Sequence, residues 1–319
     1  MEHKLANRPK SWDKFLIKTL HSQFDRARRR IEERIDQALT MSRHKFKRRR
    51  KCPPFDGDPR FALITVNYST TRYLKLMLLT LAEQSSLELL KRIIIVDNCS
   101  RDDGSSFLRE LAAQTTRISV VENRWFLTHA RGMRRGLRLL DMLEPDPAAP
   151  GNANIVLSCD ADVVFRRRDT LSGLARVFIE EGAALAGELR KHLYPYPEAQ
   201  ASFIAVRRDC YSRKDIAPWV NHGAPAYWMQ RSIWRAGLPV VNFPSNHGGY
   251  ILHRGRSGVA ASRLFFPYSS YATVHNSAAH YMGVPEGARI WEDIEAGWED
   301  FLQPEAQERL IGHLAKHFG

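Results

Sequence analysis

Short apolar runs alternate with segments of helical period between residues 60 and 160, and this alternation constrains the fold more than any other feature of the sequence. The runs are rich in β-branched residues, which predicts four buried strands over 61–68, 93–96, 118–121 and 153–158. The amphipathic segments between them predict helices over 70–90, 105–114 and 128–143. Strands that are apolar throughout are typical of parallel sheets with helices on both faces. We therefore predict an α/β fold with a mostly parallel, Rossmann-like sheet and right-handed crossovers.

The pattern after residue 162 is less regular. It predicts helices over 169–181 and 225–236, strands over 201–207, 239–243 and 250–253, and a helical tail over 285–319. With 319 residues, of which 44% are hydrophobic, the chain can bury one large core or two small ones.

Positive charge is concentrated at the N-terminus. Residues 1–51 contain 17 Lys/Arg and 6 Asp/Glu, against 48 and 35 in the whole chain, so the remainder is nearly neutral. Apolar residues recur in this segment at the spacing of one helix face, at Phe15, Leu16, Leu20, Phe24, Ala27, Ile31, Ile35 and Leu39. The basic cluster 43–51 follows, and Pro53 and Pro54 end the helix. We therefore predict a basic helical arm ahead of the α/β body.

An amphipathic helix with a cationic face suits an anionic membrane surface, so residues 11–51 are predicted to attach the protein to one. Two alternatives stay open, because the apolar face could instead pack on a partner helix or on the protein's own body. Nucleic acid is a less suitable partner, since purely electrostatic binding needs no apolar face. Nothing in the sequence indicates an oligomeric state.

The sequence lacks the features of an exported or membrane-spanning chain. No apolar run approaches the roughly 20 residues of a spanning helix, and the N-terminus has no signal-peptide core. The four cysteines form no C-x-x-C pair; they are Cys52, Cys99, Cys159 and Cys210. We therefore expect a cytoplasmic protein with reduced thiols, attached to the inner face of the membrane if the arm binds lipid.

Polar residues follow three of the predicted strands at the points where those strands end. They are Asn67, Asp97, and the pair Asp160 and Asp162. Ligands of open α/β sheets bind at the carboxyl ends of strands, so these groups are candidates for one site. Two carboxylates so close in sequence can share a Mn²⁺ or Mg²⁺ ion, which would neutralise a diphosphate. The alternative for each aspartate is a turn that caps the next segment.

These segments resemble family 2 glycosyltransferases and their GT-A-fold relatives. The resemblance covers residues 61–165 and is carried by 64–68 (ITVNY), 95–100 (IVDNCS), 102–104 (DDG), Asn123 and 159–162 (CDAD). It implies a GT-A sheet and transfer of a sugar from a nucleotide-diphosphate donor to a glycan or lipid-linked acceptor. It also implies Mn²⁺ or Mg²⁺ as the cofactor. A UDP-sugar is the favoured donor, with GDP- and dTDP-sugars as alternatives.

The resemblance implies roles for individual residues. The nucleotide-binding candidates are Val66, Asn67, Tyr68, Asp97, Asn98, Asn123, Arg131, Asp160 and Ala161. Asp97 would accept a hydrogen bond from the base, and Arg131 would reach a phosphate. The metal ligands would be Asp160, Asp162 and His253, and the diphosphate would be bound by Arg254 and Arg256. For the histidine ligand, the alternatives are His247, His275 and His280.

An inverting transfer also requires a base that deprotonates the acceptor hydroxyl. The family usually supplies a carboxylate from an acidic motif that opens a helix, but the corresponding residues 221–228 (NHGAPAYW) contain no acid. The candidates are therefore His222, Glu188 and Asp215. A retaining reaction without such a base is the alternative.

These expectations divide the chain into four segments. They are the basic arm and linker 1–58, the donor-binding half 59–168, the acceptor-binding half 169–284 and the helical tail 285–319. The basic charge lies in the first of them and the predicted donor site in the second.

Two other functions stay open. A non-catalytic scaffold or assembly protein of a glycan or nucleic-acid complex would account for the missing acid and for the basic arm. A nucleotidyltransferase that makes nucleotide sugars would carry a Gly-rich phosphate loop after the first strand. This chain has Ser69, Thr70 and Thr71 there instead, which disfavours that function.

Overall fold

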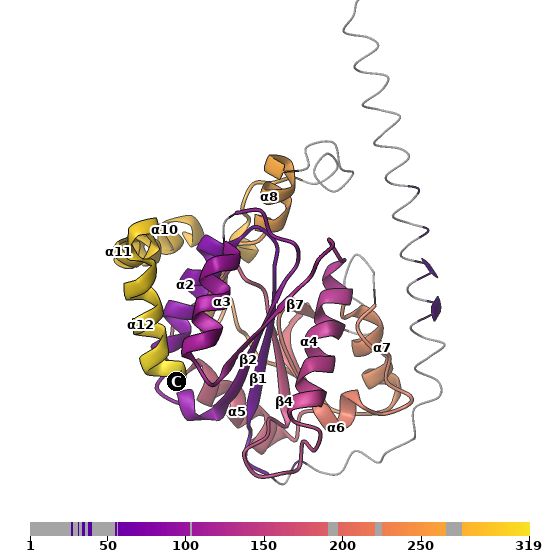
Figure 1. Cartoon of the computed structure of the whole chain (residues 1–319). Helices are drawn as coiled ribbons and strands as arrows, with labels where there is room; N and C mark the ends of the chain where they lie inside the picture. Colours follow the sequence, from indigo (N-terminus) through magenta and orange to yellow (C-terminus); the bar gives the residue numbers. More distant parts are fainter. Residues whose placement is uncertain are drawn as a thin grey trace, which may run out of the picture.

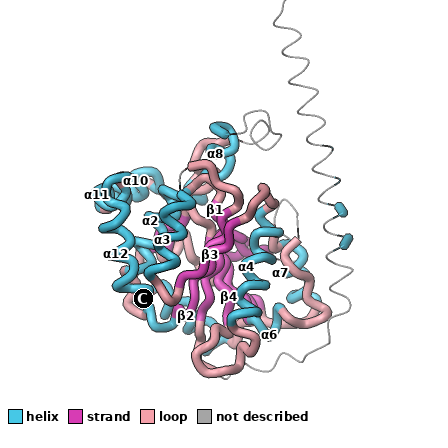
Figure 2. The backbone as a smooth tube through the Cα atoms, in the orientation of Figure 1, coloured by secondary structure: helices cyan, strands magenta, loops and turns pink. Residues whose placement is uncertain are grey.

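A seven-stranded sheet crosses the body of the protein, and helices cover both of its faces (Figure 1, Figure 2). The computed structural model describes residues 27, 31, 34, 35, 38, 39, 55, 57–102, 104–190, 197–220, 225–265 and 276–319. His222, one of the predicted site residues, lies outside these ranges.

The first part of the sheet is parallel, in the order β3-β2-β1-β4. Its strands are β1 (Phe61–Asn67), β2 (Leu90–Asp97), β3 (Ile118–Glu122) and β4 (Ile155–Cys159). Every residue of β4 and all but one of β1 are buried, as expected for strands that are covered on both faces.

The second part of the sheet begins with β7 (Glu198–Arg207), which runs antiparallel to β4. Beyond it lie β6 (Leu185–Arg190), antiparallel to β7, and β8 (Val240–Asn242), parallel to β6. Among the described strands of this sheet, β7 alone therefore runs against the others. The predicted α/β fold with a mostly parallel sheet is confirmed.

Helices from distant parts of the chain share one face of the sheet. They are α2 (Thr71–Ala82), α3 (Gly104–Gln114), α5 (Thr170–Glu181), α10 (Gly287–Gly297), α11 (Glu299–Leu302) and α12 (Gln307–Phe318). The predicted helical tail thus belongs to the main core, because buried side chains of α12 pack with those of α2 and α3. The 3₁₀ turns are Leu87–Leu89, Tyr281–Gly283 and Pro304–Ala306.

The opposite face of the sheet is covered by α4 (His129–Leu143), α6 (Arg208–Tyr211) and α7 (Tyr227–Arg235). Glycine lets α4 approach the sheet closely. A Cβ added to Gly136 would lie 2.6 Å from Cγ2 of Ile64 on β1. The long helix before the candidate site is therefore held tightly against the strand that ends beside it.

The helix predicted over 70–90 ends early, at Ala82. Tertiary hydrogen bonds compete with its continuation, because the Gln84 side chain donates to the Arg167 carbonyl and the Ser85 amide to the Arg168 carbonyl. Helical periodicity alone does not reveal such contacts with a distant loop.

Three further features concern the arm and the thiols. The six described arm positions are helical and exposed, and they include Ile31, Ile35 and Leu39; the other arm residues lie outside the described part. None of the helices within the described ranges is long and apolar enough to cross a bilayer. Cys210 is disulfide-bonded, so the expectation of reduced thiols is wrong for it, since sequence spacing reveals only local pairs.

Candidate metal and donor site

The candidate site lies at the carboxyl edge of the parallel strands. After β4 the chain turns, with the Val163 amide donating to the Asp160 carbonyl over 3.2 Å, and enters β5 (Val163–Phe165). β5 pairs antiparallel with β9 (Ile251–His253), and Val163 lies opposite His253. This pairing brings the histidine beside Asp162, although the two residues are far apart in the sequence.

Asp160, Asp162 and His253 form a compact cluster. One potential ligand atom from each residue lies within 4.8 Å of the other two. His253 Nε2 is 3.2 Å from Asp162 Oδ1 and 3.5 Å from Asp160 Oδ2. Ala161, between the aspartates, is buried in the core, so the turn that carries both carboxylates lies against a packed interior.

The charges in this cluster reinforce one another. Burial opposes ionisation of Asp162, but the charge of His253 and hydrogen bonds from His253 and Ser257 outweigh it, so the pKa of Asp162 lies well below its ordinary value. Burial also opposes protonation of His253, but the two carboxylates raise the pKa of this imidazole above its ordinary value. The carboxylates thus form a site for positive charge.

These residues fit a divalent cation. Two carboxylates and an imidazole are the ligand types that Mn²⁺ accepts, and Mg²⁺ would use the carboxylates. Asp162 and His253 are 7% exposed each, so water competes poorly for them. His253 Nδ1 is buried and has no hydrogen-bond partner among the described residues.

The loop after β9 holds Asp162 in place. The Arg254 amide donates to the Asp162 carbonyl over 2.9 Å, and the Ser257 amide to Asp162 Oδ2 over 3.4 Å. The Arg254 guanidinium lies 4.8 Å from the centroid of the Tyr73 ring, whereas Arg256 is exposed at the start of α8 (Ser257–Phe265). Both arginines therefore follow His253 within three residues, while their binding of a diphosphate stays a prediction.

His129 is a site residue that the sequence analysis missed. Its Nε2 lies 3.4 Å from Asp160 Oδ1, at the first residue of α4. The predicted residue on the same turn is Arg131, which is exposed. A histidine at the start of the helix that follows β3 was the available signal, because that helix begins at the carboxyl edge.

Asn67 and Asp97 are buried register partners on β1 and β2. Asn67 Nδ2 donates to Asp97 Oδ1 over 3.0 Å, and the Ser100 amide donates to Asp97 Oδ2 over 3.2 Å. Asp97 thus stabilises the turn after β2. This is the structural role given above as the alternative to ligand binding. Because a carboxylate oxygen accepts more than one hydrogen bond, Oδ2 keeps capacity for a ligand N–H.

Asn98 and Asn123 stabilise the loop between β3 and α4. The side chain of Asn98 donates to the Leu127 carbonyl over 2.5 Å and accepts from the Leu127 amide over 2.8 Å. Asn123 donates to Asn98 Oδ1 over 3.1 Å and accepts from Arg135 over 2.5 Å. These two predicted nucleotide-binding residues therefore fix the backbone at the edge of the site.

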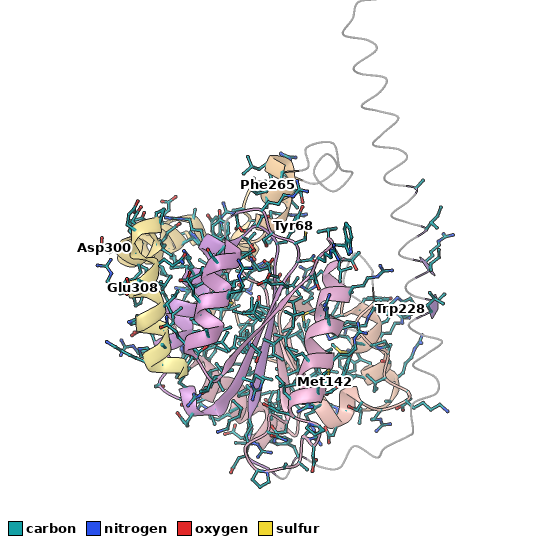
Figure 3. All side chains as sticks on the ribbon, in the orientation of Figure 1. Tyr68, Met142, Trp228, Phe265, Asp300 and Glu308 are labelled. Carbon is teal, nitrogen blue, oxygen red and sulfur yellow. The ribbon has the colours of Figure 1, made fainter. Side chains whose placement is uncertain are left out.

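Val66 lies near the end of β1, and Tyr68 is the first residue after it. The Tyr68 ring packs on Phe126, with 4.8 Å between centroids, and it hydrogen-bonds to Ser262 of α8. Figure 3 labels Tyr68 close to the end of the molecule that carries α8. Val66 packs on α4, where a Cβ added to Gly132 would lie 3.0 Å from it.

Glu188, a candidate base, lies near the end of β6, and its carboxylate is already engaged. Its Oε2 accepts from the Asn246 amide over 2.5 Å, and from the Ser245 hydroxyl and the His247 amide over 3.3 Å each. Its Oε1 contacts His247 Nδ1. The turn that links β8 to β9 is therefore built around this carboxylate.

Asp215 lies elsewhere. It follows α6, which Figure 1 places at the end of the sheet opposite α8, and forms a bidentate ion pair with Arg213 over 2.9 and 2.7 Å. Asp215 lies far from the candidate site because β7 runs antiparallel to β4 and carries the chain away from the carboxyl edge.

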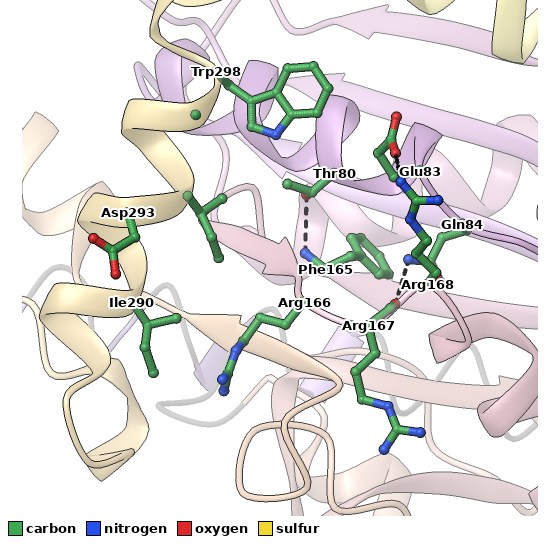
Figure 4. A pocket seen from close by; sticks show the side chains of 12 residues that line it. Thr80, Glu83, Gln84, Phe165, Arg166, Arg167, Arg168, Ile290, Asp293 and Trp298 are labelled. Carbon is green, nitrogen blue, oxygen red and sulfur yellow. Dashed lines mark hydrogen bonds and ion pairs between the residues drawn. The ribbon is translucent and has the colours of Figure 1, made fainter.

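A separate open groove of about 440 Å³ lies between α2, α10 and the segment after β5 (Figure 4). Its lining includes Arg166, Arg167, Arg168 and Trp298. No member of the aspartate and histidine cluster lines it. Two of its cations are paired, Arg167 with Asp169 and Arg168 with Glu83.

Several solved structures are similar to this chain. The mannosyltransferase PcManGT from Pyrobaculum calidifontis, in complex with GDP-Man and Mn²⁺, is 16% identical with a TM-score of 0.44, over 94% of this chain and 85% of that one. S. aureus TarS 1-349 is 12% identical with a TM-score of 0.46, over 81% and 89%. GalNAc-T7 with UDP, GalNAc and Mn²⁺ is 10% identical with a TM-score of 0.43, over 59% and 43%. No curated protein matches the chain in sequence.

One family model matches part of the sequence. Residues 62–214 match the family described as Glycosyl transferase family 2. The matched segment contains β1, β2 and β4, with the polar residues that follow them, and therefore the carboxylates of the candidate site. The resemblance drawn from the sequence is confirmed over this segment, which is just under half of the chain.

Proposed function

We propose that this protein transfers a sugar from a nucleotide-diphosphate donor to a glycan or lipid-linked acceptor, using Mn²⁺ or Mg²⁺. The observation that carries the proposal is the cluster of Asp160, Asp162 and His253 at the carboxyl edge of a family 2 domain. A UDP-sugar is the favoured donor, with GDP- and dTDP-sugars as alternatives.

The protein contributes pre-organised charge to this reaction. A bound divalent cation would neutralise the diphosphate as it leaves. Asp162 and His253 would hold that cation from buried positions, where electrostatic interactions are stronger than in water. Asp160 would be the third ligand of the cation. Arg254 and Arg256 would bind the diphosphate oxygens from the loop that follows β9.

The nucleoside would lie beyond the ends of β1 and β2. A base N–H would donate to Asp97 Oδ2, which also accepts the Ser100 amide, and Asn67 would keep that carboxylate oriented. Tyr68 would flank the nucleoside at the carboxyl end of β1. The loop that Asn98 and Asn123 fix would close the side of this pocket.

Calorimetry with UDP and GDP, with and without Mn²⁺, tests the donor site. The wild type should bind at least one nucleotide more tightly with Mn²⁺, and the double variant Asp160→Ala, Asp162→Ala should lose that gain. Asp215→Ala, which removes a carboxylate at the other end of the sheet, is the matched control. Equal affinities for the wild type and the double variant would refute the proposal.

Release of free sugar from the donor separates an enzyme from a non-catalytic scaffold. Wild-type protein with Mn²⁺ should hydrolyse at least one UDP- or GDP-sugar slowly, because water can replace the acceptor. A scaffold would bind nucleotide without releasing sugar.

We also propose that the arm attaches the protein to an anionic membrane surface. Ile31, Ile35 and Leu39 support this proposal, since they belong to the apolar stripe and are 58, 50 and 55% exposed. A bilayer interface would cover them, while the basic residues of the arm contact anionic headgroups.

A further inference from the structure

The structure contains a histidine–glutamate pair that the donor site does not use. His247 Nδ1 contacts Glu188 Oε1, while the other oxygen of Glu188 accepts two backbone amides and a hydroxyl from the same turn. The Glu188 side chain is 14% exposed and that of His247 is 56% exposed. A largely covered carboxylate thus contacts an imidazole that is more than half exposed.

Strand register places this pair at the edge where the candidate donor site lies. Ile204 of β7 lies opposite Ser158 of β4 on one side and opposite Gly187 of β6 on the other. Glu188 is therefore level with the end of β4, two strand spacings away, which is about 10 Å.

Residues next to the pair interact with the metal cluster and with a histidine beside it. Asn246, which precedes His247, accepts the His253 amide on Oδ1 over 2.9 Å. Arg190, two residues after Glu188, acts electrostatically on His280, whose ring lies 5.7 Å from that of His253. The pair thus lies beside the donor site without being one of its ligands.

We propose that His247 is the base that deprotonates the acceptor hydroxyl and that Glu188 is its positioning residue. The inference rests on the proposed function. With its Nδ1–H donated to Glu188, neutral His247 presents Nε2 as a proton acceptor. Glu188 itself is a poor base for this task, because its oxygens already accept four contacts from the turn.

The proposed step is an inverting displacement. The acceptor oxygen forms a bond to the anomeric carbon as its proton moves to His247 Nε2. The bond from that carbon to the diphosphate oxygen breaks, and the nucleoside diphosphate leaves with the electron pair. The resulting imidazolium is stabilised by the Glu188 carboxylate, as an aspartate stabilises the histidine of a serine protease.

Two nucleophiles separate this role from a structural one. Water must lose a proton when it attacks the donor, whereas azide carries none and needs no base. We would measure sugar release and glycosyl azide formation with Mn²⁺ and the donor that the wild type hydrolyses. His247→Ala should lower hydrolysis by about 10²–10⁴-fold, keep azide transfer within a few-fold and keep the affinity for UDP.

Glu188→Gln and His317→Ala complete the design. Glu188→Gln should lower hydrolysis and spare azide transfer, because the amide keeps the shape of the carboxylate but lacks its charge. His317→Ala, a histidine of α12, should match the wild type in both reactions. If His247→Ala hydrolyses the donor at the wild-type rate, the inference is overturned while the proposed function stands. The same holds if both variants lose equal activity with water and with azide. A wild type that neither binds nor hydrolyses any donor would instead overturn the proposed function.

Discussion

Replacing His253 with alanine should destabilise the metal-free protein in a way that depends on pH. His253 and Asp162 are 10 and 9% exposed as side chains, so removing the imidazole leaves a buried carboxylate without its cationic partner. Breaking one partner of a buried pair typically costs about 3–5 kcal/mol of unfolding free energy. We expect a loss of about 3 kcal/mol, because Ser257 still donates to the carboxylate.

The pH dependence follows from the two pKa shifts. The lowered pKa of Asp162 means that its contribution exists above the ordinary value of 3.8 and is lost as pH falls through the folded-state value. The raised pKa of His253 means that its contribution exists below 6.5 and is lost as pH rises through the folded-state value. The destabilisation by His253→Ala should therefore be largest between pH 3.8 and 6.5 and shrink in alkaline solution.

Urea unfolding in EDTA, followed at several pH values, measures this difference. His129→Ala is the matched control, because this histidine also contacts a site aspartate but the pair is more exposed. The side chain of His129 is 33% exposed and that of its partner Asp160 is 30% exposed. An ion pair so exposed contributes about 1 kcal/mol or less. The reasoning would be refuted if His253→Ala lowered the unfolding free energy by the same amount at acid and alkaline pH. It would also be refuted if His253→Ala and His129→Ala lowered it equally.

Three further predictions concern metal binding, packing and the arm. Mn²⁺ affinity of the wild type should fall as pH drops below the raised pKa of His253, because the ion must displace a proton; calorimetry at several pH values would show this. Gly136→Ala should lower the unfolding free energy by about 1–3 kcal/mol, because its Cβ would collide with β1, whereas Gly312→Ala, with open space in α12, should raise it by up to about 1 kcal/mol. The double variant Ile31→Asp, Ile35→Asp should sediment less with phosphatidylglycerol vesicles than the wild type, and unchanged sedimentation would contradict the membrane proposal.

The sequence by itself determined the parallel part of the sheet and the resemblance to family 2 glycosyltransferases. Apolar runs without polar alternation are typical of strands covered on both faces, so β1, β2 and β4 were predictable from local composition. The β-branched run of β3 was predictable too, although this strand lies at the edge of the sheet and is only partly buried. The carboxylates Asp160 and Asp162 were visible as a pair because only one residue separates them in the chain and they follow such a strand. The missing acid before α7 was equally a property of the sequence alone.

Only the tertiary structure decided which distant groups meet at the site. The pairing of β5 with β9 places His253 beside Asp162, and the start of α4 brings His129 to Asp160. The direction of β7 sends Asp215 to the other end of the sheet, while the turn before β9 occupies Glu188. These outcomes depend on strand pairing between remote segments, whose energies are spread over many contacts and leave no local pattern in the chain.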